Sequence, residues 1–172
     1  IDASRWTPRY PEPEGVVRLV HAPSSRAVKG TEAILEAVAT LKRRGVPVEL
    51  DLVEGMPHAE AAKRFAAADV FVEQVLIGWH GITALEGMCL GRPVVCYTDP
   101  QARRDTAEAF GREVPLVSAT PDDLVQVLGD LVSDRAHLAA LGREGRAYVE
   151  AVHDLVPVGQ RLLAAYRERG LV

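Results

Sequence analysis

Hydrophobic and polar positions follow two periodicities along the chain from residue 16 onward. Short, β-branched apolar runs predict strands at residues 16–23, 48–53, 69–75, 93–97 and 114–120. Apolar residues at helical spacing predict helices between them, at residues 31–44, 56–68, 81–90 and 101–110. From residue 121 to the end, the pattern is helical throughout.

This order of elements predicts an α/β fold. Strands that alternate with helices form βαβ crossovers, so we expect a Rossmann-like, doubly wound, mostly parallel sheet with helices on both faces and a helical C-terminal annex. Residues 1–15 hold three prolines and no periodicity. They are interpreted as a linker or tail that Trp6 and Tyr10 anchor to a surface, before one domain over residues 16–172.

Composition narrows the classes of function. Apolar residues make up 48% of the 172 residues and charged residues 26%, which is ordinary for a soluble globular protein. A net charge of −4 argues against a nucleic-acid partner, and no apolar run reaches the roughly 20 residues of a transmembrane segment. Cys89 and Cys96 lie in apolar stretches and are expected in the core. We therefore expect a cytoplasmic location.

Two further features concern the origin of the chain. It begins with isoleucine, which leads us to expect a processed or excised piece. Only three of its 20 basic residues are lysine, a bias that favours a high-GC bacterial gene.

The loop after the first strand is the first candidate site, because ligands of such sheets bind outside the carboxyl ends of the strands. It contains Ser24, Ser25, Arg26, Lys29 and Gly30. A cation at the start of a helix faces the positive end of the dipole, a conflict that a bound anion resolves. Hydroxyls, two cations and backbone N–H groups thus predict a diphosphate site, with a solvated surface pair as the alternative. Neither GxxxxGK nor GxGxxG is present.

The loop before the third helix of the sheet region is the second candidate. Gly78 and Gly81 flank a Trp-His pair and allow close approach of a ligand to the backbone. The N–H groups of Gly81, Ile82 and Thr83 then open a helix. A tight turn packed by Trp79 is the alternative for this loop. His80 is a candidate base or sugar contact, with a structural or solvated histidine as the alternative.

Glu86 is the third candidate, since it interrupts an apolar helix. A carboxylate there is suited to accept hydrogen bonds from vicinal hydroxyls such as those of a ribose, unless it is a partly exposed helix residue. The histidines are scattered without ligand spacing, so no metal site is predicted. GxSxG is missing as well, which argues against a serine hydrolase.

At these residues the sequence resembles the C-terminal, donor-binding domain of a GT-B fold glycosyltransferase, from the large retaining family often called family 4. Residues 77–95, IGWHGITALEGMCLGRPVV, resemble the family stretch E-G-F-G-x-x-x-x-E-A-M-A-x-G-x-P-V-V. Residues 26–30 resemble the basic loop that ends in K-G, and residues 65–72, FAAADVFV, resemble Y-x-x-A-D-V-x-V. Residues 161–166 resemble the closing helix, so the match covers roughly residues 16 to 169.

The resemblance implies transfer of a glycosyl unit from a nucleotide-diphosphate sugar, with retention and usually without a metal or other cofactor. Lys29 and Arg26 would hold the diphosphate and stabilise charge on the leaving phosphate. The amides of residues 81–83 would assist them. Glu86 matches the second Glu of the family's E-x7-E motif and would bind the ribose, with the base against residues 53–56.

The chain departs from that motif at Gly78, where the family has its first Glu, a contact of the donor sugar. Glu73, Gln74 and His80 are the alternatives for this role. The length also implies that the N-terminal GT-B domain, which binds the acceptor, is absent, and that this piece cannot transfer sugar alone. Competing hypotheses are another GT-B enzyme such as a nucleotide-sugar 2-epimerase, and a non-enzymatic nucleotide or sugar-phosphate binding module.

Overall fold

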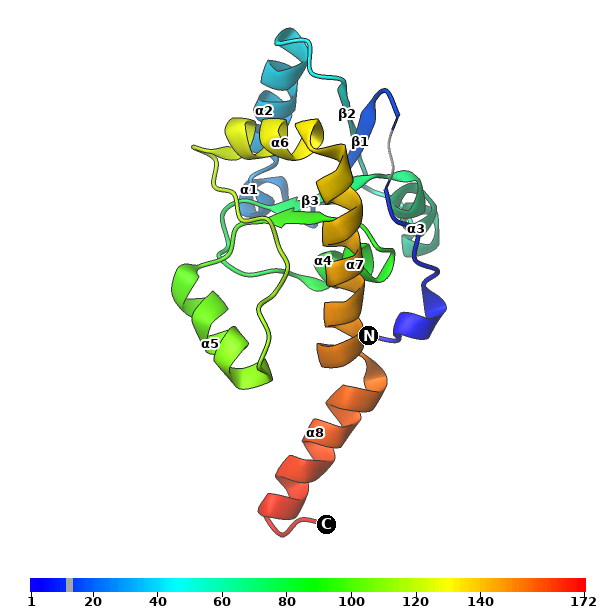
Figure 1. Ribbon diagram of the computed structural model, residues 1–172, viewed down its shortest axis with the longest axis vertical. Helices are drawn as coiled ribbons and strands as arrows, with labels where there is room; N and C mark the ends of the chain where they lie inside the picture. The colour runs from blue at the N-terminus through cyan, green and yellow to red at the C-terminus, as the bar shows by residue number, and fades with distance from the viewer. Residues whose placement is uncertain (12–13) are drawn as a thin grey trace.

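Four parallel strands form the centre of the molecule in the computed structural model, which describes residues 1–11 and 14–172 (Figure 1). They are β1 (Val17–His21), β2 (Val48–Leu52), β3 (Val70–Gln74) and β4 (Val94–Cys96), in the spatial order β2-β1-β3-β4. The chain runs outward from β1 to one edge of the sheet and from β3 to the other. This confirms the predicted doubly wound fold and places its switch point between β1 and β3.

Apolar side chains on both sides of the strands build two separate cores. On β3, Phe71 joins one core, while Val70 and Val72 join the other. On β4, Val94 and Cys96 face the first core and Val95 the second. Successive strand residues point to opposite faces, so a continuous apolar run is the pattern that a sheet covered on both faces requires.

Helices cover the two faces and extend beyond them (Figure 1). They are α1 (Arg26–Lys29), α2 (Thr31–Arg43), α3 (His58–Ala67), α4 (Ile82–Cys89), α5 (Pro100–Phe110), α6 (Leu124–Ser133), α7 (Arg135–Val152) and α8 (Leu155–Glu168). Side chains of α2 and α6 pack in the second core and those of α3 and α4 in the first, whereas α7 contributes to both. The predicted helical C-terminal annex comprises α6, α7 and α8, of which α8 extends away from the sheet. None of the helices within the described residues is long and apolar enough to cross a membrane.

Three local predictions need correction. The expected strand at residues 114–120 is a single parallel bridge between Val95 and Val117, because Pro115 has no N–H to continue the ladder. The expected loop at residues 24–30 contains the short helix α1, which ends at Gly30 with φ +73°. In the N-terminal segment, Ala3–Arg5 form a 3-10 turn, η1, where no element was predicted, whereas Trp6 packs against the first core and anchors the segment as predicted.

Candidate functional site

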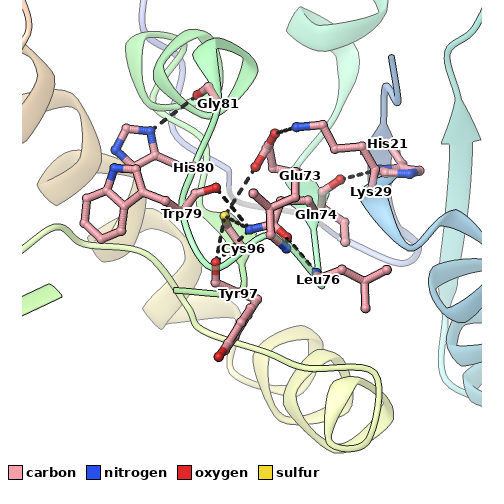
Figure 2. Close-up of polar contacts among 12 residues, drawn as sticks. His21, Lys29, Glu73, Gln74, Leu76, Trp79, His80, Gly81, Cys96 and Tyr97 are labelled. Carbon is pink, nitrogen blue, oxygen red and sulfur yellow. Dashed lines mark hydrogen bonds and ion pairs between the residues drawn. The ribbon is translucent and has the colours of Figure 1, made fainter. Parts of the chain in front are cut away.

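Buried polar side chains gather at the carboxyl edge of the sheet, at the switch point between β1 and β3 (Figure 2). His21 ends β1 with its Nδ1 2.7 Å from the carbonyl oxygen of Val72 and its Nε2 2.8 Å from the Thr31 hydroxyl. Burial lowers the pKa of His21 against the opposing effects of the carbonyl and Glu73. The neutral ring therefore donates from Nδ1, accepts at Nε2, and fixes the start of α2 to β1 and β3.

Lys29 comes from the last position of α1 and reaches across to the end of β3. Its ammonium forms an ion pair with the Glu73 carboxylate, and the two side chains are 13% and 1% exposed. The other oxygen of Glu73 lies 3.3 Å from the Cys96 sulfur. The predicted phosphate-binding lysine thus points to the switch point, where it contacts a buried carboxylate that the sequence offered only as a possible sugar contact.

A β-bulge positions Glu73. The pairing of β3 with β4 runs from Val72 opposite Val95 to Gln74 opposite Cys96, so Glu73 is the extra residue. Bulges commonly redirect a side chain next to a functional site. Here the bulge brings two polar side chains, those of Glu73 and Gln74, into the buried end of an otherwise apolar strand.

Gln74 holds the loop that leads to α4 (Figure 2). Its Oε1 accepts hydrogen bonds from the N–H groups of Leu76 and Ile77, both at 2.7 Å. Its Nε2 donates to the carbonyl oxygens of Tyr97 at 2.7 Å and Trp79 at 3.2 Å. A completely buried amide therefore satisfies backbone groups that no helix or strand pairs.

The start of α4 lies directly against the lysine–carboxylate pair. A Cβ atom on Gly81 would stand 3.0 Å from Oε1 of Glu73 and 3.4 Å from Nζ of Lys29. Gly81 is the N-cap of α4, so Ile82 and Thr83 follow in its first turn. The structure thus brings Lys29, Glu73 and a helix N-terminus together, as the phosphate hypothesis requires of Lys29 and α4.

The other glycines of the predicted site have backbone roles. Gly30 has φ +73°, and a Cβ there would lie 2.5 Å from a methyl group of Val75, so α1 can turn into α2 only at a glycine. Gly78 has φ +88°, and its carbonyl oxygen accepts a 2.7 Å hydrogen bond from the N–H of Asp99. Ser24 and Ser25 are exposed at the start of α1.

Arg26 has a different partner from Lys29. Its guanidinium donates two hydrogen bonds to the Glu54 carboxylate, at 2.9 and 2.6 Å, and lies 3.4 Å from Glu32. The bonds to Glu54 raise the pKa of Arg26 and lower that of Glu54. Arg26 thus ties α1 to the loop after β2, and the two cations expected to act together have separate carboxylate partners.

Glu86 faces α3. Its Oε1 lies 2.7 Å from Nε2 of His58, and the residue is 8% exposed. The pair borders a cavity of about 680 Å³, which Ile82, Leu90 and Trp6 also line. A buried carboxylate at the wall of a mostly apolar cavity is the kind of group that fixes a ligand's orientation. The sequence pattern identified Glu86, whereas His58 became visible only through its contact.

His80 lies in an aromatic cluster with Trp79 and with His153, the C-cap residue of α7. Its ring stacks near Trp79, at 5.1 Å between centroids, and meets the His153 ring edge-on at 5.8 Å. Burial lowers the pKa of His80, and within residues 1–11 and 14–172 its buried Nε2 has no hydrogen-bond partner. The predicted role of His80 as base or sugar contact stays a prediction.

The strand order and the groups at the carboxyl edge of the sheet define the class of fold. A parallel sheet in the order β2-β1-β3-β4, with charged groups and a helix N-terminus at its switch point, is a Rossmann-like, doubly wound α/β domain. No family model matches the chain.

Known proteins make the comparison specific. The GDP-mannose-dependent monoacylated alpha-(1-6)-phosphatidylinositol monomannoside mannosyltransferase of Corynebacterium glutamicum is 26% identical, over 94% of this chain and 53% of its own length. The C-terminal domain of a group 1 glycosyltransferase, LpcC of Francisella tularensis, has a TM-score of 0.61 at 16% identity, covering 90% of this chain and 99% of that domain. Anabaena HepE in complex with UDP-glucose has a TM-score of 0.62 at 15% identity, covering 89% of this chain and 49% of that one.

These comparisons confirm the resemblance inferred from the motifs. The chain has the fold of the C-terminal half of a GT-B protein and is similar in sequence to a glycosyltransferase. It spans about half the length of the curated relative that it matches.

Proposed function

We propose that this domain binds the nucleoside diphosphate of an activated sugar and forms the donor half of a retaining glycosyltransferase. The observation that carries the proposal is the convergence of Lys29 and the first turn of α4 at the switch point. A lysine ammonium supplies a full positive charge, and unpaired N–H groups at a helix start supply directed donors. Both favour a ligand with closely spaced negative oxygens.

The same groups are suited to assist departure of a diphosphate. As the glycosidic bond breaks, negative charge grows on the phosphate oxygen that leaves, and a positioned cation stabilises it. In this proposal Lys29 makes that contact directly, with the amides of Gly81, Ile82 and Thr83. Arg26 adds positive charge at the rim once it releases Glu54. The proposal includes no metal or cofactor.

The nucleoside would lie along α4, toward α3. Glu86 accepts hydrogen bonds from the ribose hydroxyls, in competition with or beside His58, and the base lies near residues 53–56. The relative from Corynebacterium is named for GDP-mannose and the Anabaena structure contains UDP-glucose, which supports a nucleotide sugar as the ligand class and leaves guanine and uracil as the first bases to try.

In this proposal, acceptor binding and sugar transfer require a second domain in addition to this one. GT-B enzymes bind donor and acceptor between two domains, and the chain has the fold of one of them. We expect the isolated chain to show neither transfer nor donor hydrolysis. Robust turnover by this piece would contradict that expectation.

Calorimetric titration tests the proposal. UDP, GDP and ADP, and then UDP-glucose and GDP-mannose, are titrated into the chain in metal-free buffer and again with EDTA. We expect one nucleoside diphosphate to bind without metal, and Lys29→Ala to weaken it at least about tenfold, the usual range for loss of a charge-assisted hydrogen bond.

Lys42→Ala is the matched control, because Lys42 is an exposed lysine on α2 and its loss changes the net charge equally. It should leave the affinity within about twofold, as expected of a screened surface charge. If no nucleotide binds at millimolar concentration, the domain is a scaffold rather than a donor-binding unit. If Lys29→Ala binds as tightly as the parent, the diphosphate site is wrongly placed.

A further inference from the structure

The Glu73 carboxylate occupies the point where a bound anion would be expected. It lies beside both the Lys29 ammonium and Gly81, the N-cap of α4, and its side chain is only 1% exposed. A carboxylate this deeply buried is rare unless it is paired. The register of the β3–β4 pairing shifts between Val72 and Gln74, so Glu73 is the residue at this irregularity.

We propose that Glu73 is a built-in counter-ion of Lys29 that sets the phosphate affinity of the site. This inference rests on the proposed function, because it takes Lys29 as the diphosphate contact. The carboxylate holds the ammonium at the edge of the sheet and at the same time neutralises it. An incoming phosphate therefore meets a lysine that is already paired, and its binding is weaker than an unpaired ammonium would provide.

Coulomb's law gives the direction of the effect. A negative charge in contact with the lysine opposes a phosphate that approaches the same lysine, and the opposition is stronger at a buried site than in water. Weak phosphate binding has a use in a transferase, because the nucleoside diphosphate left after transfer must dissociate. Glu73 thereby limits product affinity without removing the cation that the leaving phosphate needs.

Glu73→Gln tests this, since glutamine keeps the shape and an acceptor oxygen but removes the charge. The probes are inorganic pyrophosphate, UDP and GDP, and the uncharged nucleosides uridine and guanosine, measured by NMR titration in metal-free buffer. We expect Glu73→Gln to bind pyrophosphate and the preferred nucleoside diphosphate at least about fivefold more tightly, a modest fraction of a full contact charge pair at high effective dielectric. The affinity for the nucleoside should stay within twofold, because it has no phosphate.

Glu36→Gln is the matched control. Glu36 pairs with Arg43 at 2.9 Å on the exposed side of α2, so this variant makes the same change in net charge away from the site. It should leave the affinity for pyrophosphate unchanged. An equal gain in both variants would mean that net charge, and not the pairing of Lys29, sets the affinity, and would overturn the proposal.

The other outcomes of these titrations decide between the proposal, its failure, and failure of the proposed function. Unchanged or weaker phosphate binding by Glu73→Gln overturns the proposal, whether the nucleoside is affected or not. If Glu73→Gln does not fold, Glu73→Asp decides: it withdraws the carboxylate by one methylene, so a gain in pyrophosphate affinity supports the proposal and no gain overturns it. If the parent chain binds neither pyrophosphate nor any nucleotide, the proposed function itself fails.

Discussion

Replacement of Gln74 by leucine should destabilise the domain more than any polar surface change. Leucine has a similar volume but cannot make the four bonds to Leu76, Ile77, Trp79 and Tyr97. The expected effect is therefore one of lost hydrogen bonds rather than of packing, in a side chain that is 0% exposed.

The magnitude follows from those bonds. Each contributes about 0.5–1.5 kcal/mol net, so four contribute roughly 4 kcal/mol. The N–H groups of Leu76 and Ile77 lie in a loop with exposed side chains and can turn to water, which lowers the cost. Leucine also recovers about 1 kcal/mol through apolar burial. We expect Gln74→Leu to lower the free energy of unfolding by roughly 3 kcal/mol.

Urea denaturation followed by circular dichroism measures this change from the shift in midpoint at constant m-value. Gln126→Leu is the control, because exposed Gln126 also bonds through its amide, to Asp130 at 2.9 Å, and should cost no more than about 0.5 kcal/mol. Hydrogen exchange should show faster exchange at the amides of Leu76 and Ile77. A cost below about 1 kcal/mol, or one equal to that of the control, would refute the role given to Gln74.

Two other predictions concern the α7 region. Burial, with the neighbouring His80 and Arg161 charges, lowers the pKa of His153 to about 4. Below about pH 6.5 the unfolded chain therefore binds a proton at this residue that the folded domain does not bind. Stability should drop by about 2 kcal/mol more in the parent than in His153→Phe between pH 7.5 and 5, and parallel pH profiles of unfolding would contradict this. Gly142→Ala should lower the free energy of unfolding by about 3 kcal/mol or more, because its Cβ would overlap the carbonyl oxygen of Gly91. Gly159→Ala, which has open space around it, should leave stability unchanged or slightly raise it in the same denaturation assay.

Much of the architecture could be predicted because it depends on local patterns. The apolar runs and the helical spacing located all four strands of the sheet and the helices that cover it, and α6, α7 and α8 lie in the stretch from residue 121 onward that was predicted to be helical. The strand predicted at residues 114–120 does not form, because Pro115 has no N–H to donate to the neighbouring strand.

The sequence predicted several residues of the candidate site but not the pairs that they form. Glycine spacing and lone charges identified Lys29, Gly81 and Glu86 from the sequence. Their partners Glu73 and His58 lie 44 and 28 positions away along the chain, respectively from Lys29 and Glu86. No local pattern specifies such contacts.

By itself, then, the amino-acid sequence determined the class of fold, and it predicted a ligand site at the carboxyl edge of the sheet with Lys29 as its phosphate contact. Only the tertiary structure decided that this lysine is already paired with a buried glutamate and that Arg26 binds Glu54 instead of sharing its site. The reason is physical. Hydrophobic periodicity acts within an element, whereas the charge environment of a side chain is set by whichever elements the crossovers and the bulge in β3 place beside it.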